Sequence, residues 1–318
     1  LLRNLPKYYF AITGVISICT FIIVSFLLFT IFNWMGGIPK GSVIMYALTL
    51  GAIASCTAQS ALAIVNRNYQ IHSKGLLELL RYITSVDGLF AVALFYLVYS
   101  LFSQSNTQFV GSIGWLILSI AVGILPGIVL VILSKTRFSQ QEYNLFLVGT
   151  VLFCGGLSYQ LNTSPLVAGL LCGFITANFC RHRLRALEIT VKAEKSIYIL
   201  LLLMVGALWQ FSLNLWLLVG VAYFLIRLMA KVIGAYLSTK MFKPQYEVPG
   251  SIGLGLISEG GLAFAIILNL HLYNTEITKA LISVLVVSVL TSELLAPTLI
   301  VKQFRSEIGT LKPRNSLQ

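Results

Sequence analysis

Charged residues are scarce in this chain. They make up 10% of its 318 residues, and only one of them, Asp87, is an aspartate. Hydrophobic residues, in contrast, make up 58%. A soluble domain of this size does not need so many long apolar runs, so the composition predicts an all-α polytopic membrane protein.

Cysteine and histidine, which bind metals or form disulfides, are also few. The five cysteines lie in apolar runs without paired or metal-ligand spacing, and the three histidines are scattered near the ends of apolar runs. This pattern argues against a resident metal site and favours packing roles for the cysteines. The chain also lacks a Walker-type glycine loop. We therefore expect no cofactor, no enzymatic activity and no metal beyond a transported monovalent cation.

Ten apolar stretches are candidates for crossing a bilayer, for which a helix needs about 20 mostly apolar residues. The predicted spans are 8–32, 41–65, 76–102, 112–134, 143–160, 165–180, 195–211, 213–238, 250–271 and 278–303. They form one predicted transmembrane domain over 1–304, followed by a short cytoplasmic tail over 305–318.

The net charge of +12 is explained by membrane topology. When the loops are assigned alternately to the two sides, sixteen Lys and Arg residues fall on one side and two on the other. Basic residues accumulate in cytoplasmic loops, so this split predicts a multi-pass protein of the cell membrane with both termini in the cytoplasm. The orientation of the protein in the lipid bilayer explains the excess of basic residues, and a nucleic-acid partner is not needed.

The topology predicts two three-span repeats of inverted orientation. Spans one to three start from the cytoplasm and the last three start from the opposite side, as an inverted repeat requires. The two repeats would cover about 8–102 and 213–303, with intervening helices over 112–211.

The middle span of each repeat has a polar or glycine-rich centre, GAIASCTAQS over 51–60 and GLGLISEGG over 253–261. Small and hydroxyl residues allow a helix to break at the membrane midplane, where freed backbone groups line a site. Close packing through small residues would explain the glycines and alanines, but not Gln59 or Glu259. We predict two discontinuous, crossing helices. The predicted helix-break residues are Ser55, Ala58, Gln59, Ser258, Gly260 and Gly261.

Asp87 lies near the middle of its span, where an aspartate costs about 2.5–3.5 kcal/mol. Such residues usually mark an ion or proton path, although a structural salt bridge or a span edge is the alternative. Arg227 and Lys231 are four residues apart and share a helix face. Buried cations need partners, and for both residues the carboxylates on neighbouring spans are the obvious ones. For Lys231 these are Asp87, Glu259 or Glu293. We favour Asp87, because Glu259 is also needed to offset exposed helix amino termini where Ala58 cannot.

Five segments in order resemble the monovalent cation:proton antiporter superfamily, most closely its second branch of sodium/proton and potassium/proton exchangers. They are GAIASCTAQSALAIV, TSVDGLFAVALF, NTSPLVAGLLCGFITAN, RLMAKVIGAYL and GLISEGGLAFAI. The similarity covers about 1–302. It implies that Asp87 is the ion-binding aspartate, that Lys231 is the family's basic residue, and that the protein is a homodimer. It also implies about three further amino-terminal spans, so we expect a fragment or an unusually short member.

Two positions depart from the pattern of this superfamily. Ala58 stands where many members have the aspartate of a Thr-Asp pair. Val86 stands where they have the first Asp or Asn of a paired motif. The residue before the ion-binding aspartate often separates electroneutral from electrogenic members, and valine matches neither class.

The function that we predict is antiport of Na⁺ or K⁺ against protons by alternating access at Asp87. Thr57 and freed backbone carbonyls would supply further oxygen ligands, which suit hard cations. The supporting charges would be Lys231, Arg227, Glu259 and Glu293. One alternative is an organic-anion carrier of related fold that binds its substrate at Arg227 and Lys231. Another is a non-transporting membrane sensor or partner subunit, which the departures at positions 58 and 86 favour.

Overall fold

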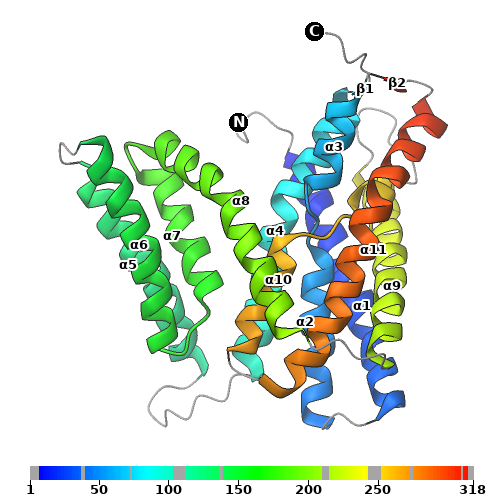
Figure 1. The fold of residues 1–318 in the computed structure, drawn as a ribbon, viewed down its shortest axis with the longest axis horizontal. Helices are drawn as coiled ribbons and strands as arrows, with labels where there is room; N and C mark the ends of the chain where they lie inside the picture. Colours follow the sequence, from blue (N-terminus) through cyan, green and yellow to red (C-terminus); the bar gives the residue numbers. More distant parts are fainter. Residues whose placement is uncertain are drawn as a thin grey trace. The chain divides into compact units, whose positions relative to one another are not determined.

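The computed structural model describes residues 7–36, 40–71, 74–102, 112–135, 139–209, 215–242, 252–272, 275–308 and 311–313. Helices dominate it, which confirms the all-α expectation (Figure 1). The helices are α1 (Lys7–Met35), α2 (Lys40–Ser55), α3 (Ser60–Asn68), α4 (Lys74–Phe102), α5 (Ser112–Leu133), α6 (Gln140–Gln160), α7 (Pro165–Phe179), α8 (Arg183–Leu208), α9 (Leu215–Phe242), the 3₁₀-helix η2 (Ile252–Leu256), α10 (Gly261–His271) and α11 (Thr275–Ile308).

Five helical segments among the described residues are long and apolar enough to cross a membrane. They are Tyr8–Met35, Ser42–Asn68, Gly75–Phe102, Leu215–Phe242 and Thr278–Phe304. Shorter apolar stretches occur in α5, α7 and α10. This supports a multi-pass membrane protein, while the count of ten spans stays a prediction. One reason for the difference is that α10 follows a break, so only 11 residues remain in that helix.

The chain forms two compact units. Unit 1 contains Leu1–Phe95 and Leu208–Gln318, and unit 2 contains Tyr96–Ala207. Unit 1 therefore contains most of both segments that the sequence assigns to the inverted repeat, and unit 2 contains the intervening helices. The inverted relation itself stays a prediction.

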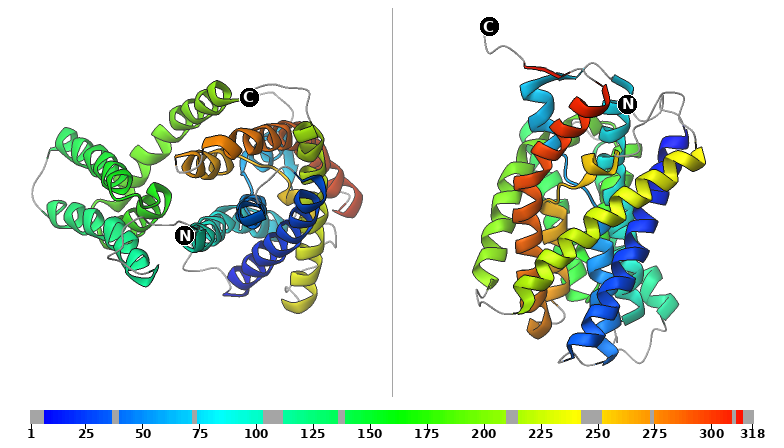
Figure 2. Two further views of the ribbon diagram at one scale, coloured as in Figure 1. Left: turned by 90° about the horizontal axis from the view of Figure 1, so that it is seen from below. Right: turned by 90° about the vertical axis from the view of Figure 1, so that its right-hand side faces the viewer.

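In unit 1, α1 packs along α2 and α9, and α9 also packs along α11 (Figure 2). One hydrophobic core joins α1, α3, α4, η2 and α11, with Ile16, Leu80 and Ile300 among its fully buried residues. This packing fixes the helices on which the buried charges lie.

A short antiparallel pair of strands ties two distant parts of unit 1 together. β1 (Tyr69–Ile71) follows α3, and β2 (Leu311–Pro313) follows α11. Gln70 pairs with Lys312 in this ladder. Because α11 continues to Ile308, the segment predicted as a tail from 305 begins as helix and contains a paired strand.

In unit 2, α5 packs against α6 and α7. Pro126 lies inside α5 and has no N–H group, so the carbonyl of Val122 loses its helical donor. The thiol of Cys154 on α6 donates to that carbonyl at 3.8 Å. All five cysteines are free, and the described residues contain no metal-binding group of three or more His, Cys, Asp or Glu side chains.

The start of α6 shows a capping box. The Ser139 side chain accepts from the Glu142 N–H at 3.3 Å, and the Ser139 N–H donates back to the Glu142 carboxylate at 2.6 Å. Two amides that lack helical acceptors are thereby bonded. The backbone N–H of Ser139 also holds the pKa of the Glu142 carboxyl below its ordinary value.

Candidate functional site

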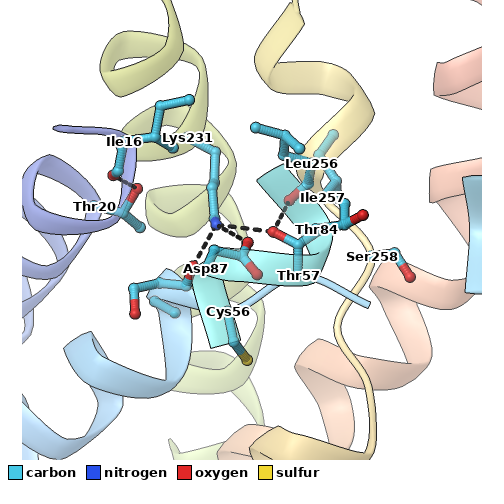
Figure 3. A network of polar contacts seen from close by, with 12 residues as sticks. Ile16, Thr20, Cys56, Thr57, Thr84, Asp87, Lys231, Leu256, Ile257 and Ser258 are labelled. Carbon is cyan, nitrogen blue, oxygen red and sulfur yellow. Dashed lines mark hydrogen bonds and ion pairs between the residues drawn. The ribbon is translucent and has the colours of Figure 1, made fainter. Parts of the chain in front are cut away.

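Two helices of unit 1 are interrupted, and the interruptions contact each other. The first break is 56–59, between α2 and α3, and the second break is 257–260, between η2 and α10. The Ala58 N–H donates to the Ser258 carbonyl at 2.9 Å. The Thr57 hydroxyl donates to the Leu256 carbonyl at 3.4 Å (Figure 3). Backbone groups freed at one break are therefore bonded by the other.

Small residues allow this close approach. A Cβ placed on Gly260 would lie 2.7 Å from the Cβ of Ala58. A Cβ placed on Gly253 in η2 would lie 2.7 Å from the Lys231 carbonyl of α9. Real Cβ atoms essentially never come this close to other heavy atoms. The glycine-rich sequence over 253–261 thus lets η2 lie against α9 and the second break lie against the first break.

The last carbonyls of α2 are all hydrogen-bonded, although a helix leaves its final four without partners of its own. Two donors are local and two are the buried cations of α9. The pairs are Ser55 Oγ to the Ala52 carbonyl (2.7 Å), Cys56 N to Ile53 (3.1 Å), Arg227 Nε to Ala54 (3.2 Å) and Lys231 Nζ to Ser55 (2.6 Å). Both cations therefore lie at the negative end of the α2 dipole.

Arg227 is fully buried and joins the two breaks. Its guanidinium donates to four carbonyls, those of Ala54 (3.2 Å), Cys56 (2.8 Å), Ser258 (3.2 Å) and Ile257. The sequence led us to expect a carboxylate partner, but within the described residues Arg227 forms no ion pair. Carbonyls of two broken helices instead supply the negative partial charge.

Asp87 and Lys231 form the one ion pair among the described residues, with Asp87 Oδ2 3.5 Å from Lys231 Nζ. Both side chains are 0% exposed. The ammonium also donates to the Thr57 hydroxyl at 2.9 Å, and Figure 3 shows the three side chains pointing toward one another. Asp87 Oδ1 is buried and has no hydrogen-bond partner in the described part of the chain. Lys231 thus lies against Asp87, and not against Glu259 or Glu293.

Glu259 forms a separate buried cluster. Its carboxylate accepts from the Tyr223 hydroxyl at 3.0 Å and from the Ser288 hydroxyl at 2.7 Å. Sequence reasoning missed both partners. Tyr223 lies four residues before Arg227 and eight before Lys231, so helical spacing could have revealed it. Ser288 had no such signal.

Glu293 is half-buried and contacts the second break and the start of α3. Its carboxylate accepts from Ser258 at 2.6 Å and from Ser60 at 3.0 and 3.1 Å. Gln59 in the first break donates to Ser85 of α4 at 2.8 Å. Ser60 and Ser85 were not among the predicted site residues, because exposed serines are too common to carry a sequence signal.

All the predicted site residues lie in unit 1, where three groups form. Asp87, Lys231 and Thr57 make one, Glu259 makes the second, and Glu293 with Ser258 makes the third. The Ser55 carbonyl, which accepts from Lys231, ties the first group to α2. Arg227 bonds the Ala54 carbonyl of α2, and Gly261 begins α10. Buried carboxylates, hydroxyls and carbonyls are oxygen ligands, which suit hard cations.

The family to which the chain belongs follows from a comparison with known families. The model of the transmembrane sodium/hydrogen exchanger family matches residues 1–301, which include both breaks, Asp87 and Lys231. A comparison with curated proteins found no match. The family match confirms the resemblance found in the sequence, and the family consists of transporters, not enzymes. The chain belongs to the sodium/hydrogen exchanger family of multi-pass membrane proteins, whose general activity is cation/proton antiport.

Proposed function

We propose that this protein exchanges a monovalent cation, Na⁺ or K⁺, for protons by alternating access at Asp87. The observation that carries the proposal is the burial of Asp87 beside the first break, with Oδ1 lacking a hydrogen-bond partner among the described residues. An ionised carboxylate in a membrane span is costly unless a cation or a proton neutralises it. Asp87 therefore needs one of the two at all times.

The contacts of Lys231 support a cation site. Its ammonium has three oxygen neighbours: the Ser55 carbonyl, the Thr57 hydroxyl and the Asp87 carboxylate. A dehydrated monovalent cation carries the same charge and takes the same kind of ligand. In our proposal the incoming cation displaces the ammonium from Asp87 and uses these oxygens. A proton, the ammonium and the transported cation then compete for one carboxylate, and this competition couples the two fluxes.

Arg227 has a different part in this proposal. Its bonds to carbonyls of both breaks hold them together, so the breaks can move as one piece between the two access states. The Asp87 carboxylate is neutralised by a proton or by the transported cation in the loaded states, and by the Lys231 ammonium in the structure. A carboxylate with none of these three partners cannot readily pass a low-dielectric barrier. The inverted repeat, the homodimer and the cytoplasmic termini belong to the same proposal and rest on the sequence.

The organic-anion alternative has less support. Arg227 has five N–H donors, and four of its hydrogen bonds go to carbonyls. Lys231 is bonded to Asp87, Thr57 and Ser55. These contacts leave few N–H donors available to an anionic substrate. The sensor alternative is tested by the flux experiment that follows.

The test is proton flux in proteoliposomes after addition of Na⁺, K⁺ or Li⁺. We expect the wild-type protein to respond to at least one cation and Asp87→Asn to lose the response while still inserting and folding. Glu78→Gln is the matched control, since it removes an exposed carboxylate from the same helix and should retain exchange. Normal exchange by Asp87→Asn would remove Asp87 from the mechanism. A wild-type protein inert to all three cations would favour the sensor.

A further inference from the structure

The carboxylate of Glu293 lies among hydroxyl oxygens and is more exposed than that of Asp87. Glu293 lies on α11 and is half-buried, whereas Asp87 is fully buried. Its two carboxylate oxygens and the hydroxyls of Ser60 and Ser258 form a compact group, in which the two hydroxyl oxygens are 2.9 Å apart. Four oxygens therefore lie within hydrogen-bonding reach of one another. Ser60 is exposed, so the group reaches the surface of unit 1.

This oxygen cluster has too few protons for its acceptors. Each serine hydroxyl carries one proton, while an ionised carboxylate offers about four lone-pair sites. Ser60 alone lies within 3.1 Å of Glu293 Oε1, Glu293 Oε2 and Ser258 Oγ, although it can donate to only one of them at a time. In the described part of the chain Glu293 forms no ion pair. Its negative charge is solvated by hydroxyls but not neutralised.

Pro297 affects the backbone carbonyl of Glu293. It lies inside α11, four residues after Glu293, and it has no N–H group. The Glu293 carbonyl therefore lacks the donor that the next helical turn would supply. A carbonyl freed inside a membrane helix is costly unless another group contacts it. Independently of this carbonyl, the carboxylate and the two hydroxyls of the cluster are oxygen ligands of the kind that hard cations take.

The cluster is connected through the two breaks to the group of Asp87, Lys231 and Thr57. The Ser258 hydroxyl contacts Glu293, and the Ser258 carbonyl accepts from the Ala58 N–H at 2.9 Å. Thr57, the residue before Ala58, holds the ammonium of Lys231. One pair of breaks thus has the Glu293 cluster on its exposed side and Asp87 on its buried side.

We propose that Glu293, Ser60 and Ser258 form a second, outer site that takes a monovalent cation from water before the cation reaches Asp87. The inference rests on the proposed antiport function. A single carboxylate suits a single positive charge, and the described residues offer no cluster of three acidic, His or Cys ligands for a divalent ion. The outer site raises the local cation concentration beside the breaks and leaves the coupling at Asp87 unchanged.

The first test separates cation capture from a merely structural bond. Glu293→Gln keeps the size of the side chain and one acceptor oxygen but removes the charge. We expect the apparent KM for Na⁺ to rise about tenfold at low salt, with a maximal rate within about twofold of wild type. The increase should shrink when choline chloride screens the charge. Glu293→Asp should recover most of the affinity, and Glu78→Gln should behave as wild type.

The second test measures binding without transport. In an Asp87→Asn background, Na⁺ should still raise the thermal unfolding temperature above that in equal choline chloride, and Glu293→Gln should abolish this increase. No Na⁺-specific increase in the Asp87→Asn background would overturn the outer site. An unchanged KM in the Glu293→Gln variant would also overturn it, whether or not the maximal rate and the stability fall. In each of these outcomes loss of exchange by Asp87→Asn would still support the proposed function, so the two failures are distinguishable.

Discussion

Replacing Lys231 with glutamine tests how the buried ion pair is held. The change removes a cation that contacts the Ser55 carbonyl at 2.6 Å, Thr57 at 2.9 Å and Asp87 at 3.5 Å. Removing one partner of a buried pair typically costs about 3–5 kcal/mol, because the other charge is left unpaired. Leaving the Ser55 carbonyl without a donor costs about 1–3 kcal/mol where glutamine does not reach it. We therefore expect a loss of about 3–5 kcal/mol near neutral pH where glutamine still reaches the carbonyl, and a larger loss where it does not.

The pH dependence of this loss identifies its cause. Asp87 without a counter-charge is costly only while it is ionised, so Lys231→Gln should be less destabilising at pH 5 than at pH 8. Adding Asp87→Asn should recover about 0.5–3 kcal/mol, the usual range for directly coupled residues. Thermal unfolding in detergent measures both effects, and proteoliposome flux measures exchange. Equal losses at both pH values, no recovery in the double variant, and retained pH-dependent exchange would refute the pairing as a working part of the site.

Two further predictions concern competition and packing. If protons and cations compete for Asp87 alone, each pH unit below the pKa of Asp87 should weaken apparent cation binding about tenfold, or about 1.4 kcal/mol. Above that pKa the apparent affinity should reach a plateau. A KM for Na⁺ that does not change between pH 5 and 9 would contradict direct competition. Gly260→Ala should destabilise the protein by about 1–3 kcal/mol, because its Cβ would lie 2.7 Å from that of Ala58. Gly155→Ala in α6, where a Cβ has nothing within 4 Å, should be neutral or stabilising in the same unfolding assay and so serves as the control.

The breaks and the buried charges could be predicted because a bilayer penalises polar residues strongly. Gln59 and Glu259 had no packing explanation, so their places in otherwise apolar spans indicated interrupted helices. Asp87 stood out for the same reason. These signals come from side-chain type alone and need no knowledge of neighbours.

The partners of those charges were harder to predict. Arg227 bonds backbone carbonyls, and every residue has a carbonyl, so no side-chain pattern marks such an acceptor. Ser60 and Ser288 contact carboxylates, yet serines are frequent throughout the chain. The pairing of β2 with β1 depends on two short segments far apart in the sequence. Contacts of this kind depend on the tertiary arrangement, which local sequence does not encode.

The charges around the breaks also explain how this chain accommodates Ala58. A helix that starts at a break has a partial positive charge at its amino terminus, and a nearby carboxylate stabilises it. From the sequence we expected Glu259 to compensate for the missing aspartate at position 58. In the structure Glu259 precedes α10 and bonds Tyr223 and Ser288, while Glu293 contacts Ser60, the first residue of α3. Each helix that begins after a break therefore has its own carboxylate. Since Arg227 and Lys231 bond the last carbonyls of α2, the charges match the polarity of all three helix ends. None of these helix ends requires Asp87, which agrees with the ion-binding role that we propose for it.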